Sequence, residues 1–323
     1  MQSLKLQLHL KTKSSVRNLL QPLEKDYSVY PLGPPIVKPK TSSKPETATF
    51  GAAKLNTLFE IGSISKSFTG IIFAQMILAN SLSETDPVEK YIPELTGTFS
   101  GQIKLADLAT HTSGLSRMPS DIPQTLNPYS EYSWEKLLAY LKTAKQNSES
   151  KPYKLDYSNT GFALLGKVLE VASKESYSDL LKKRILIPLN MTDTCLQVQP
   201  AKLTRFIAGY WSDLTPMPHW DWLVFAPTGG IRSTTSDMIK YIKANLHIKK
   251  SNLGKAMELS QKNNWGWDSE ILKLPFPFKN GATYGFSSTM FIDHQRQAAA
   301  IILTNISYES DSLLAPILKA NNP

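Results

Sequence analysis

The spacing of apolar positions changes along the chain, and each change predicts a different kind of element. Residues 64–79 are apolar on nearly every side, which is typical of a buried helix, and the pattern stops near Asn80. Residues 286–293 and 298–306, separated by four polar residues, predict two antiparallel strands. Apolar positions on one face predict amphipathic helices over further segments, 133–145, 160–173, 177–189 and 236–246. Ser236 is the expected N-cap of the last helix.

The two ends of the chain differ in character from its middle. Residues 4–10 alternate leucine with polar residues, which predicts a half-buried strand. Residues 31–49 hold five prolines among Ser, Thr and Lys and predict an irregular arm, and a closing helix is expected at 313–321. Strands near both ends with helices between them predict an α+β fold. In it, an antiparallel sheet built from both termini is flanked by helices and carries an inserted all-helical lobe.

This arrangement divides the chain into two parts. Residues 1–49 are expected to form a basic, proline-rich arm with one candidate strand, and residues 50–323 a single unit. Within that unit, about 50–80 and 230–323 are assigned to an α/β lobe, and about 81–229 to a helical lobe.

Composition narrows the class of protein. The chain has 323 residues, 41% of them hydrophobic and 20% charged, and no apolar run of 18 residues, so no membrane span is expected. The N-terminus lacks the unbroken apolar core of a signal peptide, and the sequence assigns neither a localisation nor an oligomeric state. The net charge of +9 favours a solvated basic arm, with an anionic surface as the alternative partner. Nucleic acid is not indicated, because no recognition motif accompanies the charge.

The sequence gives no support for a metal or an organic cofactor. Cys195 is the single cysteine, which excludes an internal disulfide and a cysteine-cluster metal site. The five histidines are scattered and are expected to be structural, and His111 is expected to hold a loop near the cleft. The aromatic segment 210–225 is expected to be core or cleft wall. Phosphate-loop and dinucleotide fingerprints are absent from the sequence, so no cofactor is expected.

Ser63 and Lys66 begin the apolar helix and are the first candidates for chemistry. Positions three apart share one helix face, so the two side chains are expected to touch. A lysine buried in a core can lose its proton and act as the base for a serine. The spacing alone is weak support, because residues 133–136 and 148–151 repeat it in polar sequence. The alternative is an N-cap serine followed by a surface lysine.

Two further motifs occur once each. Y-S-N at 157–159 precedes an apolar helix, where a tyrosine near two lysines can shuttle a proton and an asparagine can bind a substrate amide. The alternative is a turn tyrosine packed on the surface. K-N-G at 279–281 begins a strand at an expected sheet edge. There a lysine can hold an anionic group, and a glycine lets a substrate backbone approach closely.

In this order and spacing, the three motifs resemble those of the penicillin-recognising serine hydrolases. Class C β-lactamases and the related D-Ala-D-Ala carboxypeptidases and esterases are the most similar members. The flanking sequence is similar too, as in "LFEIGSISKSFTG", "DLATHTSGL", "YSNTGFALLG", "APTGGIRSTTSDM" and "NGATYGFSS". The resemblance covers roughly residues 50–323 and implies a β-lactamase/transpeptidase-like fold.

The resemblance implies a role for each motif residue. Ser63 would be the acylated nucleophile, and Lys66 and Tyr157 would share the general-base role. Asn159 would orient the substrate amide. Lys279 would bind a substrate carboxylate and tune Tyr157.

The third motif would complete the substrate site. Asn280 and Gly281 would line the substrate, and the backbone N–H groups of Ser63 and Ala282 would form an oxyanion hole. Such donors typically contribute about 3–4 kcal/mol each to the transition state. The implied partner is a small-molecule or peptide substrate bearing a carboxylate, with no metal or organic cofactor.

Departures from the class C pattern leave the substrate open. Asn280 stands where class C enzymes usually have Thr, Ser158 where they usually have Ala, and Met118 lies near the place of a substrate-gripping Gln. The expected function is a serine hydrolase acting through a Ser63 acyl-enzyme, with β-lactam hydrolysis favoured and D-Ala-D-Ala carboxypeptidase, D-peptidase or esterase activity as the alternative. An inactive binding or scaffold member is a further alternative, because residues 1–56 lack the helix and second strand that the family places before its serine.

Overall fold

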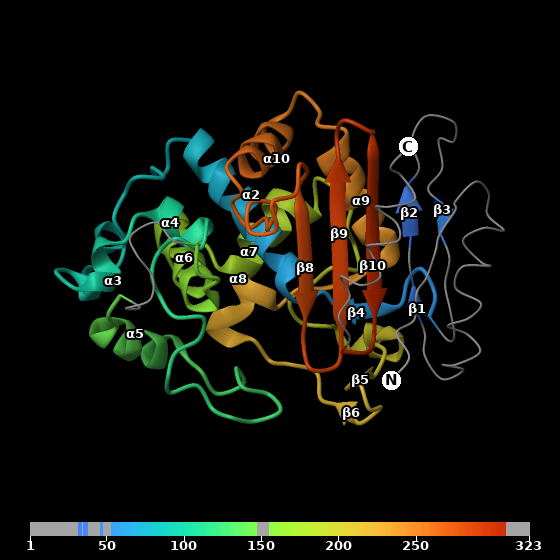
Figure 1. Cartoon of the computed structure of the whole chain (residues 1–323), viewed down its shortest axis with the longest axis horizontal. Helices are drawn as coiled ribbons and strands as arrows, with labels where there is room; N and C mark the ends of the chain where they lie inside the picture. The colour runs from blue at the N-terminus through green and yellow to red at the C-terminus, as the bar shows by residue number, and fades with distance from the viewer. Residues whose placement is uncertain (1–31, 34, 38–45, 48–52, 147–154, 308–323) are drawn as a thin grey trace.

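The computed structural model describes residues 32–33, 35–37, 46–47, 53–146 and 155–307. The strand predicted at 4–10 and the helix predicted at 313–321 lie outside them. The α-helices, labelled in Figure 1, are α2 (Ser65–Leu78), α3 (Phe99–Gln102), α4 (Leu105–Ala109), α5 (Trp134–Thr143), α6 (Asn159–Ser173), α7 (Tyr177–Leu181), α8 (Ala226–Gly229), α9 (Thr235–Leu246) and α10 (Asn252–Lys262). The strands are β1 (Leu32–Gly33), β2 (Pro35–Val37), β3 (Glu46–Thr47), β4 (Leu58–Glu60), β5 (Gly209–Tyr210), β6 (Pro216–Met217), β7 (Arg232–Thr234), β8 (Phe278–Ala282), β9 (Ser287–Asp293) and β10 (Ala298–Thr304). None of the helices in these ranges is long and apolar enough to cross a membrane.

One antiparallel sheet joins strands from the two ends of the chain. Its order is β3-β2-β10-β9-β8, and β1 also pairs with β10. β9 and β10 pair along their full length, from Ser287 opposite Thr304 to Asp293 opposite Ala298. β8 pairs with β9 alone among the described strands, so the K-N-G motif lies on a sheet edge as predicted. The predicted α+β fold, with a sheet drawn from both ends, is confirmed.

Short strands occur inside the segment that was predicted as an irregular arm. β2 pairs with β10, and β3 pairs with β2. Pro35 is the first residue of β2, a position that tolerates proline's fixed φ and missing N–H. These strands exist because β10 offers a partner edge, which the local sequence does not show. The division into residues 1–49 and 50–323 stays a prediction.

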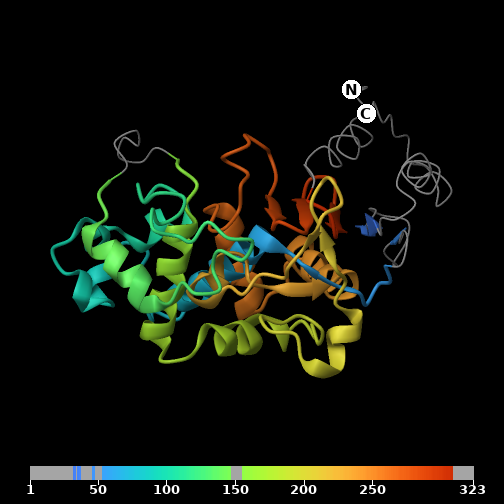
Figure 2. The same ribbon diagram turned by 90° about the horizontal axis from the view of Figure 1, so that it is seen from below.

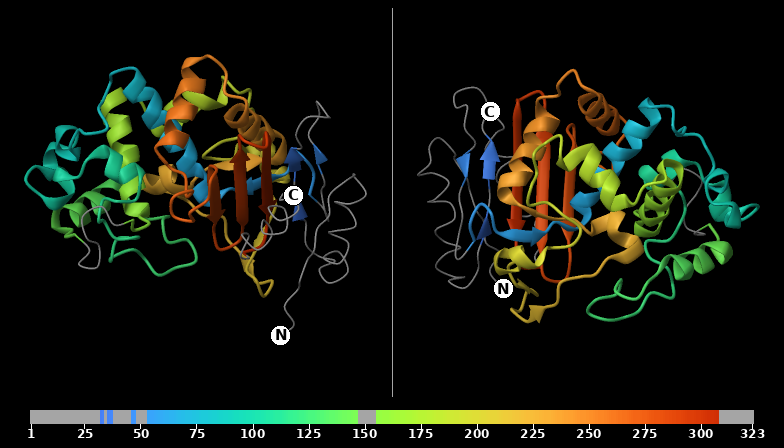
Figure 3. Two further views of the ribbon diagram at one scale, coloured as in Figure 1. Left: turned by 45° about the horizontal axis from the view of Figure 1, so that its top comes forward. Right: turned by 180° about the vertical axis from the view of Figure 1, so that it is seen from behind.

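The helices lie in two places relative to the sheet. Figure 1 shows α3, α4, α5 and α6 gathered away from the sheet, with α2 between them and the strands. Figure 2, turned by 90°, separates the same two parts with the strands seen nearly end on. The view from behind in Figure 3 shows α9 across the far face of the sheet, where it packs on β9 and β10. α2 is therefore the element that both parts share.

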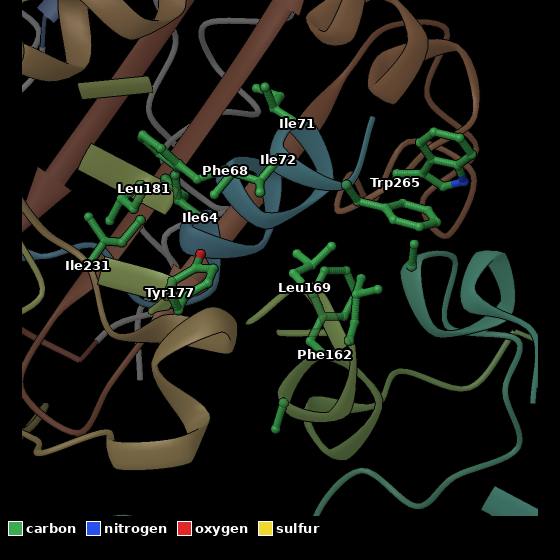
Figure 4. Close-up of a cluster of buried hydrophobic side chains, with 14 of the residues drawn as sticks. Ile64, Phe68, Ile71, Ile72, Phe162, Leu169, Tyr177, Leu181, Ile231 and Trp265 are labelled. Atoms are coloured by element: carbon green, nitrogen blue, oxygen red, sulfur yellow. The ribbon is translucent and has the colours of Figure 1, made fainter. Parts of the chain in front are cut away.

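The central helix α2 is buried on almost every side, as its apolar pattern predicts. Phe68 stacks on Tyr241 with ring centres 3.9 Å apart, and Phe73 packs against Trp265 at 4.7 Å. Figure 4 shows that α2, α6 and α7 all contribute side chains to the buried hydrophobic cluster around α2. The helix ends at Leu78, and Asn80 follows with a φ of +53°, so the predicted end is confirmed. Such close packing on several elements holds the start of α2 in one place.

The predicted cap of α9 is wrong by two residues. Thr234 is the N-cap, because its Oγ1 accepts a hydrogen bond from Asp237 N at 3.2 Å. The N–H of Ser236 instead donates to Leu55 O at 3.0 Å. Thr234 is also the last residue of β7, paired with Leu58, so the strand runs directly into the helix. The strand that sets this boundary is only three residues long and left no clear pattern in the sequence.

Candidate functional site

Ser63 and Lys66 stand in direct contact at the start of α2. Ser63 lies in a 3₁₀ turn, Gly62–Ile64, that leads into the helix. Lys66 Nζ is 3.0 Å from Ser63 Oγ and donates to Thr228 O at 2.8 Å. Burial, together with the charge of Lys279, lowers the pKa of Lys66 well below its ordinary value. A neutral amine at this distance can accept the serine proton.

Tyr157 lies beside both lysines. Its ring centre is 4.9 Å from Nζ of Lys66 and of Lys279, and its hydroxyl accepts a hydrogen bond from Lys279 Nζ at 3.4 Å. Burial raises the pKa of Tyr157 even though Lys279 favours the phenolate. Tyr157 is therefore a neutral phenol at neutral pH, able to donate a proton.

Lys279 is completely buried on β8, where it forms an ion pair with Asp268. Burial alone would lower the pKa of Lys279, but Asp268 and Tyr157 raise it, so the ammonium is retained. Asp268 was not predicted from the sequence. The available signal was a carboxylate placed directly after Trp265 and Trp267, because a carboxylate in apolar sequence needs a partner when it is buried.

Asn159 begins α6 with its amide turned toward two neighbours. Its Nδ2 lies 3.3 Å from Met118 Sδ and 3.5 Å from Tyr129 OH, and donates to both. Its Oδ1 is buried and has no hydrogen-bond partner in the described structure. A buried acceptor of this kind calls for a donor, and a substrate N–H can supply one.

His111 holds the loop before α6. Its Nδ1 accepts a hydrogen bond from Ser158 N at 3.0 Å, and its ring stacks on Tyr157 with centres 4.2 Å apart. Burial, with the charges of Lys279 and Lys66, lowers the pKa of His111, so the ring stays neutral. The predicted structural role of this histidine is confirmed.

β8 passes the turn of Ser63 at very short range. A Cβ at Gly281 would lie 2.3 Å from Ile61 O and 2.7 Å from Ser63 N. Gly62 has a φ of +48°, and a Cβ there would lie 2.7 Å from Ala282 N. Glycine at both positions therefore lets β8 and the turn that carries Ser63 approach each other closely. The sequence had instead predicted that Gly281 makes room for a substrate backbone.

The edge beyond Gly281 faces outward. Ala282 is exposed, and Asn280 is half-buried and pairs in register with Thr289. Ala282 thus lies on a segment next to the turn that carries Ser63, where the resemblance predicts the two N–H donors of an oxyanion hole.

Arg117 is an exposed cation beside Tyr157 that was not predicted from the sequence. Its guanidinium carbon lies 4.8 Å from the ring centre of Tyr157. Its backbone oxygen accepts hydrogen bonds from Asn159 N at 2.9 Å and Thr160 N at 3.3 Å. No local pattern marked this residue, because its contacts are with a segment forty residues away in the chain.

The aromatic segment 210–225 supplies part of the surrounding wall. Trp222 stacks on Tyr129 with ring centres 4.6 Å apart, and Trp220 packs on the same ring at 5.3 Å. Both tryptophans are buried, and Tyr129 also touches Asn159. Trp220 and Trp222 are therefore core residues that pack beside the site, in line with the predicted role of this segment as core or cleft wall.

Of the two Ser-x-x-Lys segments that the structure describes, only the one at Ser63 joins this cluster. Residues 133–136 start α5, and residues 148–151 lie outside the described residues. The described ranges contain no group of His, Cys, Asp or Glu able to hold a metal ion.

Comparison with known proteins adds an independent finding. A family model described as Beta-lactamase matches residues 40–321. A beta-lactamase of Escherichia coli (strain K12) is 25% identical over 317 residues, with 82% of each chain covered. A beta-lactamase of Lysobacter lactamgenus is 30% identical over 205 residues, which cover 64% of this chain and 50% of that protein. The matched regions of several further relatives likewise span only about half of their length.

Solved structures are similar over nearly the whole chain. A class C beta lactamase superposes with a TM-score of 0.82 at 24% identity, covering 95% of this chain and 96% of that one. The beta-lactamase/D-alanine carboxypeptidase of Pseudomonas syringae superposes with a TM-score of 0.78 at 21% identity, covering 95% and 98%. At these identities the likeness concerns the fold, and the predicted β-lactamase-like fold is confirmed.

Proposed function

Because the chain belongs to the beta-lactamase family, we propose that it is a serine hydrolase that forms an acyl-enzyme on Ser63, with β-lactam amides as the favoured substrates. The observation that carries this proposal is the 3.0 Å contact between Ser63 Oγ and Nζ of the buried Lys66. A serine without a base is a weak nucleophile, and this contact supplies the base.

In the acylation step, Ser63 Oγ attacks the substrate carbonyl while its proton passes to Lys66 Nζ. The carbonyl oxygen becomes an oxyanion held by the N–H groups of Ser63 and Ala282. The C–N bond then breaks as the leaving nitrogen takes a proton from the Tyr157 hydroxyl, and Lys66 returns its proton to Tyr157. The neutral phenol and the lowered pKa of Lys66 suit these two roles.

In the deacylation step, a water molecule attacks the ester on Ser63 and gives up a proton to the pair formed by Lys66 and Tyr157. The ester C–O bond breaks, and Ser63 Oγ takes a proton back from the same pair. Lys279 keeps the Tyr157 hydroxyl in place through their hydrogen bond. The unpartnered Asn159 Oδ1 accepts the N–H of the substrate amide.

The second candidate is D-Ala-D-Ala carboxypeptidase, D-peptidase or esterase activity. Ser158 in the middle of the second motif and Asn280 in the middle of the third motivate it, since both differ from the usual class C residues. The Pseudomonas syringae protein with this fold carries both names in its description. All these reactions pass through the same acyl-enzyme and differ in the substrate and in the rate of its hydrolysis.

Intact mass during incubation with excess benzylpenicillin tests the proposal. An adduct on the protein, or consumption of the drug, that is lost in Ser63→Ala supports a Ser63 acyl-enzyme. A stable adduct favours the peptidase-like alternative, whereas consumption without an adduct favours β-lactam hydrolysis. Intact drug without an adduct, followed by no turnover of p-nitrophenyl esters, would contradict the proposal and leave the inactive binding or scaffold member.

A further inference from the structure

The lysine of the third motif is poorly placed to meet a substrate charge. Lys279 has 0% of its surface exposed. Its ammonium forms an ion pair with Asp268 and donates a hydrogen bond to Tyr157 OH. A buried ion pair is compensated internally, and separating it to serve another anion leaves Asp268 without its partner. The positive charge of Lys279 is therefore used within the protein.

An exposed cation stands next to this pair. The guanidinium carbon of Arg117 is 4.8 Å from the ring centre of Tyr157, a ring that also contacts Lys66 and Lys279. In the described ranges, no acidic side chain forms an ion pair with Arg117. Within the described ranges, the charge of Arg117 is therefore not balanced by an ion pair, and its side chain is exposed.

The backbone holds Arg117 at this position. Its carbonyl oxygen accepts the N–H groups of Asn159 and Thr160 at the start of α6. The next residue, Met118, receives the side-chain amide of Asn159 at 3.3 Å. The backbone of Arg117 is therefore held by the start of α6, which carries the residue that would orient the substrate. The Arg117 side chain is exposed.

The charge of Arg117 also acts on titratable groups of the site. Its charge is among those that lower the pKa values of Lys66 and His111, after burial and Lys279. The positive charge of Arg117 therefore contributes to the electrostatics of the groups around Ser63.

We propose that Arg117, rather than Lys279, binds the carboxylate of the substrate and so sets the preference for anionic over neutral acyl donors. This inference rests on the proposed hydrolase function. The planar guanidinium offers paired N–H donors that match the two oxygens of a carboxylate, and its carbon lies 4.8 Å from the centre of the Tyr157 ring. Arg117 is thus a specificity-determining residue outside the three motifs.

The test compares two ligands that differ only in this charge. In the Ser63→Ala background, which stops acylation, the affinities of benzylpenicillin and its methyl ester are measured by calorimetry. We expect benzylpenicillin to bind about tenfold more tightly than its ester, as a charge-assisted pair at a partly exposed site implies. Adding Arg117→Gln is expected to make the two affinities equal. Arg117→Lys is expected to restore part of the difference, because it keeps the charge without the planar fork.

Lys136→Gln is the matched control, since it removes one exposed positive charge on α5 and is expected to leave the affinity ratio unchanged. An unchanged ratio in Arg117→Gln would overturn the proposal, as would equal affinities for the two ligands before Arg117 is altered. With Ser63 intact and Arg117 unaltered, labelling of Ser63 or consumption of benzylpenicillin that is lost in Ser63→Ala decides the proposed function separately.

Discussion

Two segments among the described residues place a serine three residues before a lysine, and the structure uses them differently. At the start of α2, the lysine is buried and its Nζ lies 3.0 Å from Ser63 Oγ. At the start of α5, Ser133 Oγ accepts a hydrogen bond from the backbone N–H of Lys136 at 3.5 Å, and the lysine side chain is exposed. The same spacing makes a side-chain pair in one place and a helix cap in the other.

The surroundings of the pair, and not its spacing, therefore make it reactive. A lysine in water keeps its proton at neutral pH, because water stabilises the charge. Lys66 has exchanged water for Thr228 O, the Tyr157 ring and the field of Lys279, and this burial lowers its pKa. Matched variants in the two segments test whether burial makes this difference.

The largest expected effect is on the two serines. Ser63→Ala is expected to reduce kcat by about 10⁴-fold or more, because the nucleophile and its partners act as a unit. Ser133→Ala is expected to retain full kcat. Turnover of whichever substrate is found active measures both, and substantial activity in Ser63→Ala would reject Ser63 as the nucleophile.

The two lysines come next. Lys66→Met is expected to lower kcat/KM by about 10³-fold, within the range of a lost general base. Lys136→Met removes the same group from an exposed site and is expected to change little. Circular dichroism establishes that both variants fold. If both variants lost activity equally, burial would not be what distinguishes the two segments.

The pH dependence of kcat/KM tests whether the buried Lys66 is the base that titrates. Below the lowered pKa of Lys66 the amine is protonated and cannot accept a proton, so activity is expected to fall there and to rise as the pH passes that pKa. Asp268 is the group that raises this pKa, and therefore Asp268→Asn is expected to move the acid limb to lower pH. An acid limb that stays in place in Asp268→Asn would argue against Lys66 as the titrating base.

The same variant has a second readout in stability. Asp268→Asn leaves the buried ammonium of Lys279 without its carboxylate partner, which is expected to lower the free energy of unfolding by about 3 kcal/mol. Denaturant unfolding at constant pH measures this loss. Replacing an exposed carboxylate instead, with Glu135→Gln on α5, provides a control in which no buried ion pair is broken.

The smallest expected effect concerns capping. Ser133→Ala removes the side-chain cap of α5 and is expected to lower the free energy of unfolding by about 1 kcal/mol without affecting kcat. Ser133→Asp keeps an acceptor and is expected to retain the stability. The Ser63 turn has no side-chain cap, so Ser63→Ala is expected to cost less stability than Ser133→Ala. The reverse order would show that Ser63 is the structural serine.

Much of the fold follows from local pattern. The buried α2, the amphipathic α6 and the pair β9 and β10 have enough residues for their apolar periodicity to be visible. The strands β1 to β3 and the start of α9 were missed or misplaced. Each is a short segment whose backbone bonds depend on a partner distant in the sequence.

The site divides in the same way. Ser63, Lys66, Tyr157 and Lys279 were named from motifs, and the structure brings them into contact. Their roles in catalysis remain proposals. Asp268 and the exposed Arg117 were not found, because an isolated charged residue has no sequence pattern that separates an internal partner from a surface group.

The three motifs and the helices and strands with strong periodicity could be predicted from the sequence, because they depend on neighbours within a few turns of the chain. The burial of Lys66 and Lys279, the pairing of Lys279 with Asp268 and the exposure of Arg117 became visible in the folded structure. The reason is physical: the charge state of a side chain depends on its solvation and on charges that surround it in space, and folding brings these together from distant parts of the chain.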